Sequence, residues 1–407
     1  MKKILYIVNG NLIKGTGFSQ RIKRQMETIT QISDVDIDVV NSVSIRDLTK
    51  NYKLLTNTRK IYEQMNLRHI FFYLDFPLKI FKLFPNLFFR IKAKRIKRLV
   101  KRRKYDLVYC ENLREAYTAY LSKKNGANIE YILDYHGVVP EEFRDFGDGA
   151  IGKFNYDYLK MMEKATIQSA KKIVCVSESF KSYIVKMYNF DDKNIFVVPS
   201  CVPKSYVKYD KKIRFKLRNN LGISDRKVIV YAGSAATYQC IEEMIELFGE
   251  IIKYDSSFYF LFLVAGTSRS IIRNKFEHLN INDSYFRIDS VDHELISDYL
   301  MASDYGMIIR NNSLVNVVAS PTKILEYLST GLPIIMTNNI GDFSNTPNQK
   351  CILDYDKLKK KEINASEVID ILNKVNRDYN FEVCKELITD KYTWEKYLGV
   401  YEKLINS

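Results

Sequence analysis

The chain has 407 residues, too many for one ordinary hydrophobic core, so two domains of similar size are expected. Hydrophobic residues make up 46% of it and charged residues 27%, a balance that excludes a disordered chain. No apolar run reaches the ~20 residues of a transmembrane helix. The six scattered cysteines include no CxxC pair, which argues against structural zinc and disulfides, so a cytoplasmic location is expected.

Short aliphatic segments alternate with helical patterns along the chain, as is typical of parallel α/β proteins. The N-terminal MKKILYIVNGN is predicted to be a buried strand rather than a signal peptide, because polar residues end its apolar run. In the first half, strands are predicted at residues 3–9, 34–40, 105–111, 131–137, 172–177 and 194–200. In the second half, they are predicted at residues 227–234, 258–267, 285–291, 305–310 and 333–338.

Two prolines in VPSCVP, residues 198–203, mark the predicted boundary between these halves. We therefore predict an α/β fold with two doubly wound Rossmann-like domains that face across a cleft, where ligands meet the carboxyl ends of the strands. The expected ranges are 1–202 for the first domain and 203–388 for the second. A C-terminal helix at 389–407 is expected to cross back to the first domain.

The net charge of +15 is concentrated between residues 90 and 104, where ten basic residues occur without an acidic one. On a helix, part of this run falls on one face at spacings of three and four residues, namely Arg90, Lys94, Lys97, Lys101 and Lys104. The preceding residues 69–89 are rich in aromatics. Together the segments predict a helix pair that rests on an anionic membrane surface through residues 84–104. The alternative, a solvated face of a packed helix, leaves the ten cations unexplained, and no nucleic-acid-binding motif accompanies them.

The segment ASPTKILEYLSTGLPII, residues 319–335, contains the most specific chemistry of the chain. Ser320, Pro321 and Thr322 predict a helix start, because proline in the first turn loses no needed N–H group. The free amides of that turn form an anion site. Lys323 is unfavourable to the helix itself and becomes intelligible if a diphosphate lies beside it. Glu326, on the same helix, is suited to accept hydrogen bonds from two ribose hydroxyls.

Arg310 follows a predicted buried strand and is expected to reach the same anion with its fork of donors. The alternative interpretation treats Arg310 and Lys323 as solvated surface charges and Glu326 as an ordinary helix residue. The residues alone leave these two interpretations open.

The segment SPTKILEYLSTGLPII resembles the donor-binding helix of GT-B glycosyltransferases of the family 4 type, also called group 1 glycosyltransferases. In these proteins a P-x-K-x-x-E-Y pattern precedes a Gly-x-Pro and a strand. Further segments resemble the same family in the same order along nearly the whole chain: KILYIVNGNLIKGTGFSQRIKRQ, IVCVSE, IFVVPSCVP, VIVYAGSAATYQCIEEMIELF, FLFLVAGTS and the terminal YTWEKYLGVYEKLI.

The resemblance implies sugar transfer with retention from a nucleotide-diphosphate sugar, such as a UDP-sugar. Glu326 would hold the ribose, and Lys323 with the amides around Pro321 and Thr322 would hold the diphosphate. Arg310 would stabilise the leaving group. The donor site would also include residues from three loops: Gly233, Ser234, Gly266, Thr267 and Ser320. No cofactor is expected, and a metal is not required when lysine and arginine neutralise the phosphates.

Two positions depart from the pattern of the family. Members often carry a second glutamate eight residues before the ribose-binding one, and this chain has Val318 there. The arginine and lysine that usually follow the first donor-domain strand are replaced by SAATYQC, with Gln239 near the usual lysine position. Arg310 is therefore expected to supply the second phosphate contact.

The acceptor side is predicted from two loops of the first domain. Gly15, Thr16 and Gly17 precede a helix, and Gln20 breaks the GxGxxG pattern of a dinucleotide site, so a glycine loop near the acceptor is the better interpretation. His136 and Glu142 follow another strand; a loop histidine is most often structural, but the resemblance implies that His136 faces the sugar. No Asp/Glu pair stands out as the acid and nucleophile of a hydrolase.

We therefore expect a glycosyltransferase that acts on a lipid-linked or glycan acceptor in cell-surface glycan synthesis, such as capsule or lipopolysaccharide. It is expected to be cytoplasmic and peripheral at the inner face of the membrane. Two alternatives remain. A nucleotide-sugar epimerase of the same fold would need no acceptor, and a catalytically inactive nucleotide-sugar-binding protein would fit the loss of a glutamate at Val318.

Overall fold

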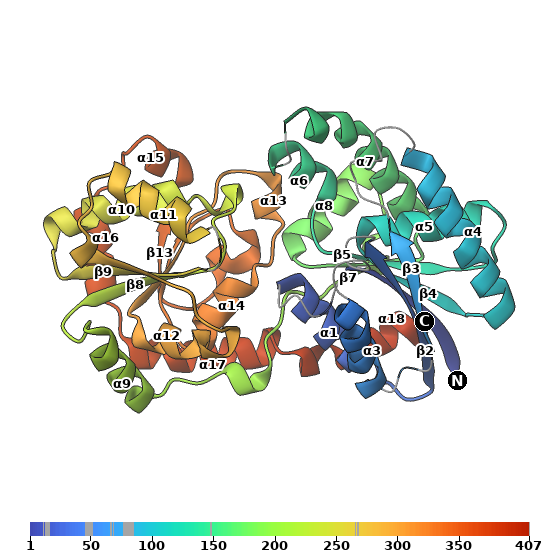
Figure 1. Ribbon diagram of the computed structural model, residues 1–407, viewed down its shortest axis with the longest axis horizontal. Coiled ribbons are helices and arrows are strands. Elements are labelled where there is room, and N and C mark those ends of the chain that lie inside the picture. The colour runs from blue at the N-terminus through green and yellow to red at the C-terminus, as the bar shows by residue number, and fades with distance from the viewer. Residues whose placement is uncertain are drawn as a thin grey trace. The chain divides into compact units, whose positions relative to one another are not determined.

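The computed structural model describes residues 1–10, 12, 17–44, 52–65, 67, 69–75, 85–146, 149–264, 266 and 268–406. The chain divides into two compact units (Figure 1). The first unit comprises Met1–Pro199 with Trp394–Ser407, and the second comprises Ser200–Thr393. From the sequence, the boundaries between the two domains were predicted to follow residues 202 and 388.

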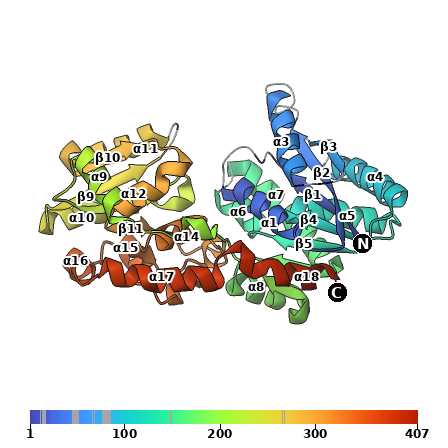
Figure 2. The ribbon, with the colours of Figure 1, turned by 90° about the horizontal axis from the view of Figure 1, so that it is seen from below.

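The first unit contains a seven-stranded parallel sheet with the strand order β3-β2-β1-β4-β5-β6-β7. Its strands are β1 Lys2–Asn9, β2 Val35–Ser44, β3 His69–Asp75, β4 Leu107–Glu111, β5 Tyr131–Tyr135, β6 Lys172–Cys175 and β7 Ile195–Val197. The helices of this unit are α1 Gly17–Ile29, α3 Tyr52–Gln64, α4 Pro85–Arg103, α5 Asn112–Lys124, α6 Val139–Phe146, α7 Gly149–Ser169, α8 Glu178–Tyr188 and α18 Leu398–Asn406. The last of these helices packs beside α1 (Figure 2).

The second unit contains a six-stranded parallel sheet with the order β10-β9-β8-β11-β12-β13. Its strands are β8 Lys227–Ala232, β9 Phe258–Leu263, β10 Phe286–Asp289, β11 Tyr305–Ile308, β12 Ile334–Thr337 and β13 Lys350–Leu353. The helices are α9 Lys211–Leu221, α10 Ile241–Tyr254, α11 Ser268–His278, α12 Ile296–Ala302, α13 Leu314–Val317, α14 Thr322–Ser329, α15 Tyr355–Lys359, α16 Ala365–Asn373 and α17 Arg377–Lys391.

Both sheets are parallel and have helices on their faces, so the predicted α/β fold with two doubly wound Rossmann-like domains is confirmed. In the second unit, α10, α11 and α16 bury one apolar cluster against the sheet, and α12, α14 and α17 bury another. The central strands are apolar on both faces for this reason. Phe260 and Leu261, neighbours on β9, belong to opposite clusters.

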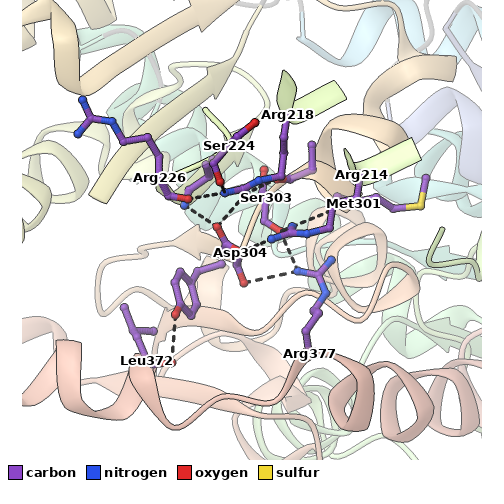
Figure 3. A network of polar contacts seen from close by, with 12 residues as sticks. Arg214, Arg218, Ser224, Arg226, Met301, Ser303, Asp304, Leu372 and Arg377 are labelled. Carbon is purple, nitrogen blue, oxygen red and sulfur yellow. Dashed lines mark hydrogen bonds and ion pairs between the residues drawn. The ribbon is translucent and has the colours of Figure 1, made fainter. Parts of the chain in front are cut away.

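Asp304, just before β11, links several parts of the second unit through a polar network (Figure 3). Its carboxylate lies 2.5 Å from Nη2 of Arg214 and 3.0 Å from Nη1 of Arg218, both on α9. It also accepts a hydrogen bond from the backbone N–H of Val228 at 2.7 Å. Arg377 donates to the carbonyl of Ser303 at 3.0 Å. The network therefore ties α9 and α17 to the amino ends of β8 and β11, away from the carboxyl ends where ligands bind in such sheets.

The predicted helix pair over residues 69–104 is wrong in its first part. Residues 69–75 form the edge strand β3, which pairs in parallel with β2, and residues 76–84 lie outside the described part of the chain. The second part is the helix α4, which ends at Arg103, so Lys104 lies beyond it with a φ of 57°. Among the described residues, none of the helices combines the length and the apolar character needed to span a bilayer.

The helix α4 has a buried face and a basic face. Ile96, Leu99 and Val100 are buried. Lys92 is buried too, and its Nζ lies 2.6 Å from Oε2 of Glu115 on α5. Six of the remaining cations are exposed on the helix: Arg90, Lys94, Arg95, Arg98, Lys101 and Arg102. The apolar pattern of this segment thus reflects ordinary packing, and the exposed charge is what packing does not explain.

Candidate functional site

In the second sheet, the order of strand addition reverses between β8 and β11. These two strands are neighbours in the sheet although β9 and β10 lie between them in the sequence. At such a switch point, the loops after the two strands diverge and leave space at their carboxyl ends. Gly233 follows β8 and Arg310 closely follows β11. The start of α14, with Lys323, contacts the same loops, so three segments predicted to bind the donor come together here.

Arg310 is a buried cation whose observed contacts are to neutral groups. It is 6% exposed, and its Nη1 donates to the carbonyl of Tyr238 at 3.2 Å. Its guanidinium carbon lies 4.7 Å from the centre of the Tyr238 ring, a cation–π contact. Nε is buried and has no hydrogen-bond partner among the described residues. An anion would satisfy this donor, because a buried unpaired N–H group is costly.

Lys323 lies over the backbone of Gly233. Its Nζ is 2.7 Å from Oη of Tyr231 and 2.8 Å from Oε1 of Gln239, and it is 4.5 Å from the centre of the Tyr231 ring. A Cβ atom on Gly233 would come within 2.3 Å of Nζ, and the φ of Gly233 is +146°. Glycine at this position therefore leaves the space that the lysine occupies.

These two cations lie in a site that disfavours positive charge. Burial lowers the pKa of Arg310. Burial, and then the charge of Arg310, hold the pKa of Lys323 well below its ordinary value, although Glu326 acts in the opposite direction. No carboxylate of a described residue lies within ion-pair distance of Arg310 or Lys323. The site therefore holds two basic groups without an ion-pair partner in the described part of the chain, and a bound anion would stabilise their charged forms.

The start of α14 is fixed by Ser320 and Pro321. The backbone N–H of Ser200 donates to Oγ of Ser320 at 3.0 Å, and Oγ of Ser200 donates to the carbonyl of Ser320 at 2.6 Å. Pro321 is the N-cap, and the helix begins at Thr322, as the sequence predicted. Gly341 approaches from the other side, where a Cβ atom would lie 1.9 Å from the carbonyl oxygen of Ala319.

Glu326 lies one turn further along α14 and lines a cavity of about 220 Å³. Its Oε1 lies 3.8 Å from Nε2 of His293, which lines the same cavity. Burial raises the pKa of Glu326, whereas His293 and Lys323 act to lower it. The carboxylate thus lines a cavity that has both apolar and polar residues in its walls, and it interacts electrostatically with Lys323.

The other residues predicted for the donor site make fewer polar contacts than Arg310 and Lys323. Ser234 is exposed, and its carbonyl accepts a hydrogen bond from Oη of Tyr231 at 2.7 Å. Gly266 is exposed with a φ of +62°. Thr267 lies outside the described residues. Val318, where a second glutamate was expected, is a buried apolar residue 1% exposed.

The first unit has a polar cluster at the carboxyl ends of β4 and β5. Nε2 of His136 lies 3.0 Å from Oε2 of Glu111 and 3.0 Å from Oδ1 of Asp134. Both carboxylates are fully buried. Gln25 on α1 donates to the other oxygen of each carboxylate, at 2.7 Å for Glu111 and 2.8 Å for Asp134.

Two stacked tyrosines and an arginine complete this cluster. The rings of Tyr6 and Tyr109 lie 4.9 Å apart. Tyr6 donates to Oε1 of Glu111, and Tyr109 donates to Oδ2 of Asp134 at 2.5 Å. Arg21 lies 3.9 Å from Asp134 and stacks over Trp394.

The two carboxylates decide the charge of His136. Burial alone would lower the pKa of this imidazole, but Asp134 and Glu111 raise it to about 9. Burial and the neighbouring Asp134 raise the pKa of Glu111 to about 7. Burial would also raise the pKa of Asp134, but His136 holds it below its ordinary value. The cluster therefore contains an imidazolium between two carboxyl groups at neutral pH.

The same three residues form the one group of potential metal ligands found in the described part of the chain, with ligand atoms within 4.8 Å of one another. Oxygen and imidazole ligands suit a divalent ion such as Zn²⁺. An ion and the proton on Nε2 of His136 would occupy the same space, so the two are alternatives.

The remaining acceptor-side predictions divide between described and undescribed residues. Gly15 and Thr16 lie outside the described residues, and Gly17 begins α1. Glu142 on α6 folds back over the loop of His136, where a Cβ atom on Gly137 would come within 2.3 Å of Oε1 of Glu142. Burial raises the pKa of Glu142, while His136 acts to lower it.

Several residues of these two clusters were not predicted as site residues from the sequence. Glu111 and Asp134 stand in predicted strands and were not distinguished from other strand acids; their position at the ends of neighbouring strands was the available signal. Gln25, Tyr231 and His293 had no local pattern that marked them, because their partners lie far away in the sequence.

Comparisons with known proteins agree with the fold. A family model described as Glycosyltransferase Family 4 matches residues 55–206. No curated protein sequence matches the chain. Three solved proteins have the same fold over 99% or more of this chain. Alr3699/HepE of Anabaena, solved with UDP and with UDP-glucose, is 10% identical with TM-scores of 0.73 and 0.70 and is covered over 100% of its length.

The second solved protein is sucrose-phosphate synthase of Thermosynechococcus elongatus, which is 14% identical with a TM-score of 0.71 and is covered over 98% of its length. The third is the lipopolysaccharide outer core galactosyltransferase WaaB, which is 12% identical with a TM-score of 0.67 and is covered over 99% of its length. The resemblance to GT-B glycosyltransferases of the family 4 type is therefore confirmed. The chain has the fold of these proteins and matches the family model over residues 55–206.

Proposed function

We propose that the protein is a glycosyltransferase that transfers a hexose, with retention, from a UDP-sugar to an acceptor in cell-surface glycan synthesis. The observation that carries this proposal is the pair of uncompensated cations, Arg310 and Lys323, at the switch point of the second sheet. A nucleoside diphosphate is an anion that matches two neighbouring cations, one of which, Lys323, lies in the first turn of a helix.

The two cations also suit the chemistry. When the sugar leaves the donor, negative charge builds up on the diphosphate, and preorganised positive groups stabilise that charge in the transition state. Lys323 contacts neutral partners, so its charge remains available to the phosphates. Arg310 supplies the contact that the sequence pattern left open. These residues neutralise the leaving group without a metal ion or a cofactor.

The nucleoside part of the donor is assigned to the cavity beside α14. Glu326 has the chemistry to accept hydrogen bonds from the ribose hydroxyls. A uracil base is favoured by the fold relative HepE, which is solved with UDP and with UDP-glucose. The loops of Gly233, Ser234, Gly266 and Thr267 complete the donor side in this proposal.

His136 is proposed to act on the reacting sugar or the acceptor, and Glu142 with Gly15, Thr16 and Gly17 remain the further acceptor-side residues of this proposal. Its two carboxylate partners keep it protonated, so it would act as a hydrogen-bond donor rather than as a base. The network under the imidazole fixes its orientation, which supports a catalytic role.

The acceptor is proposed to be lipid-linked, at the inner face of the membrane. The exposed cations of α4 support this part of the proposal, because basic groups on one helix face bind anionic lipid surfaces. Leu87 and Ile91, near the start of the same helix, are 50% and 41% exposed. The fold relative WaaB, a lipopolysaccharide outer core galactosyltransferase, agrees with a glycan acceptor of this kind.

A thermal-shift screen of nucleoside diphosphates and sugar nucleotides identifies the donor, since a ligand that binds the folded state raises its unfolding temperature. Turnover is then followed with that donor and a lipid-linked acceptor, and the anomeric configuration of the product is determined by NMR. We expect acceptor-dependent consumption of the donor with retention. Conversion of the donor sugar without an acceptor would instead establish an epimerase, and binding without turnover an inactive binding protein.

The site assignment is tested with matched variants. Lys323→Ala and Glu326→Ala are expected to abolish turnover, because each removes a proposed contact with the donor. The control is Lys374→Ala, an exposed lysine of the second unit outside the site. Full activity of both site variants would refute the assignment.

A further inference from the structure

The loop at residues 234–240 is held by the two cations of the site instead of supplying a cation itself. Arg310 donates to the backbone carbonyl of Tyr238, and Lys323 donates to the side chain of Gln239. Residues 237–239 form a short 3₁₀ helix before α10. The loop and the cations therefore form one polar unit, in which the side chain of Gln239 contacts the ammonium group of Lys323 directly.

Gln239 is almost fully buried, with 2% of its surface exposed. Of the two polar atoms of its side-chain amide, the oxygen makes a hydrogen bond to a described residue. Oε1 accepts from Nζ of Lys323 at 2.8 Å. Nε2 makes no hydrogen bond in the described part of the chain and is not among its fully enclosed polar atoms. An amide that accepts from the ammonium with its oxygen presents its two N–H donors beside the same ammonium group.

We infer that Gln239 has two functions in the donor site: its carbonyl oxygen positions Lys323, and its amide nitrogen donates a hydrogen bond to the donor's diphosphate. The inference rests on the proposed function and specifies one contact of that site. An anion that binds Lys323 comes within reach of the neighbouring N–H donors. A neutral amide at this position adds a hydrogen bond without adding a third positive charge beside Arg310 and Lys323.

The charge of the site is consistent with these two functions of Gln239. Burial and the charge of Arg310 already lower the pKa of Lys323. A third cation at residue 239 would disfavour the ammonium form further, whereas a carbonyl acceptor stabilises it. Tyr231 provides the second acceptor at 2.7 Å. Loss of the Gln239 acceptor is therefore expected to lower the pKa of Lys323 without removing the lysine from its place.

The test measures binding of UDP and uridine to the full chain by isothermal titration calorimetry. Gln239→Met keeps the size of the side chain and removes both hydrogen-bonding ends. We expect its affinity for UDP to fall by about tenfold to a hundredfold, the usual value for a hydrogen bond to a charged group. Its affinity for uridine, which has no phosphates, is expected to stay within about twofold. Gln168→Met, at an exposed position on α7, is the control and is expected to bind both ligands like the wild type.

A pH series separates the positioning function from a packing effect. In Gln239→Met, the decline of UDP affinity with rising pH is expected to begin at lower pH than in the wild type, because the ammonium form of Lys323 loses an acceptor. In Gln239→Glu, which keeps an acceptor and gains a negative charge, the decline is expected to begin at higher pH, although UDP binds more weakly throughout.

Unchanged UDP affinity in Gln239→Met would overturn the inference, and so would equal losses for UDP and uridine. A wild-type protein that binds neither UDP nor any other nucleoside diphosphate would instead contradict the proposed function. If another nucleoside diphosphate binds, the same comparison is made with it and its nucleoside, so the two failures remain distinguishable.

Discussion

Oε1 of Glu326 lies 3.8 Å from Nε2 of His293, and the two side chains line one cavity of about 220 Å³. This pair sets one wall of the space that we assign to the nucleoside. If Glu326 binds the ribose, the protein distinguishes ribose from deoxyribose through this half-buried carboxylate, because a hydroxyl removed from the ligand leaves it without that hydrogen bond.

The first prediction compares UDP with 2′-deoxy-UDP. The wild type is expected to bind UDP about tenfold more tightly, and Glu326→Ala is expected to bind the two ligands equally within about twofold. The control is Glu294→Ala, which changes an exposed carboxylate on the same cavity and should preserve the preference. Calorimetry supplies the affinities of the three proteins for both ligands. A preference that persists in Glu326→Ala would show that the ribose is bound elsewhere.

The second prediction concerns the pH dependence of UDP binding. The pKa of Lys323 is well below its ordinary value, and a bound diphosphate favours the ammonium form. Affinity is therefore expected to fall as pH rises through the pKa of Lys323, by up to tenfold per pH unit, since the complex must take up a proton. The phosphate groups of UDP are ionised above a pKa of about 6 and do not change in this range.

Lys323→Arg provides the contrast, because arginine stays charged up to a pKa of about 12. Its UDP affinity is expected to be nearly constant between pH 7 and pH 10. The same slope in both proteins would mean that another group titrates.

The third prediction concerns the charge of His136. In an NMR titration, its imidazole is expected to stay protonated through neutral pH, with a pKa of about 9. Since this value lies above the ordinary pKa of 6.5, His136 contributes stability that is complete below about pH 6.5 and is lost as pH rises towards 9. Asp134→Asn should lower the pKa, whereas Asp157→Asn, at an exposed position on α7, should not.

The same titration detects a metal ion at this cluster. A bound ion would replace the proton on Nε2, and a chelator would then change the spectrum. We expect the imidazole signals and turnover to be unaffected by a chelator. His136→Gln assigns the signal, which is needed because the chain has 4 histidines.

The fourth prediction tests the lipid surface proposed for α4. Replacement of four exposed cations by glutamine (Arg90, Lys94, Arg98 and Lys101) is expected to weaken binding to anionic vesicles by roughly 1 kcal/mol per charge. A matched variant neutralises four exposed lysines of the second unit, Lys212, Lys216, Lys360 and Lys374. Co-sedimentation with phosphatidylglycerol vesicles measures both, with phosphatidylcholine vesicles as the uncharged reference. Equal losses of vesicle binding in the two variants would mean that binding depends on the net charge of the protein and not on α4.

The fifth prediction concerns the stability of the second unit. Asp304 is about a quarter exposed, and it pairs with Arg214 and Arg218 and accepts from the N–H of Val228. Asp304→Ala removes the charged partner of both arginines, which keep carbonyl acceptors, and leaves the N–H of Val228 without its acceptor. It is expected to cost about 3 kcal/mol, or roughly 5–10 °C in unfolding temperature. Asp378→Ala removes an exposed pair with Lys211 and should change the unfolding temperature by less than about 2 °C. Scanning calorimetry compares the variants, and an unshifted Asp304→Ala would contradict the role of the network.

The strands were largely predictable because parallel strands that are buried on both faces have continuous aliphatic sequences. The two that were missed have other patterns. β3 lies at a sheet edge and reads HIFFYLD, whose aromatic run was interpreted with the basic helix that follows. β13 is another edge strand of only four residues, KCIL, too short to stand out from the surrounding loops.

The site was predictable where its chemistry is local. Pro321, Lys323 and Glu326 lie within one helical start, so their spacing marked a candidate anion site, and the family resemblance supplied the ribose and diphosphate roles that stay predictions. The contact between Lys323 and Gln239 spans 84 residues, and the sequence showed only that an expected lysine was replaced. The cluster of His136 with Glu111 and Gln25 depends on which strands become neighbours, information that no single segment contains.

The end of the Lys323 side chain lies where a side chain on residue 233 would begin, and the φ of +146° at this position also favours glycine. The two positions are therefore expected to vary together among relatives of this chain. A relative with a larger residue at 233 should hold the end of its lysine side chain elsewhere, or should have lost the lysine. The paired presence of this glycine and this lysine is thus a more selective marker of a working donor site than either residue alone, and it is readable from sequences without further structures.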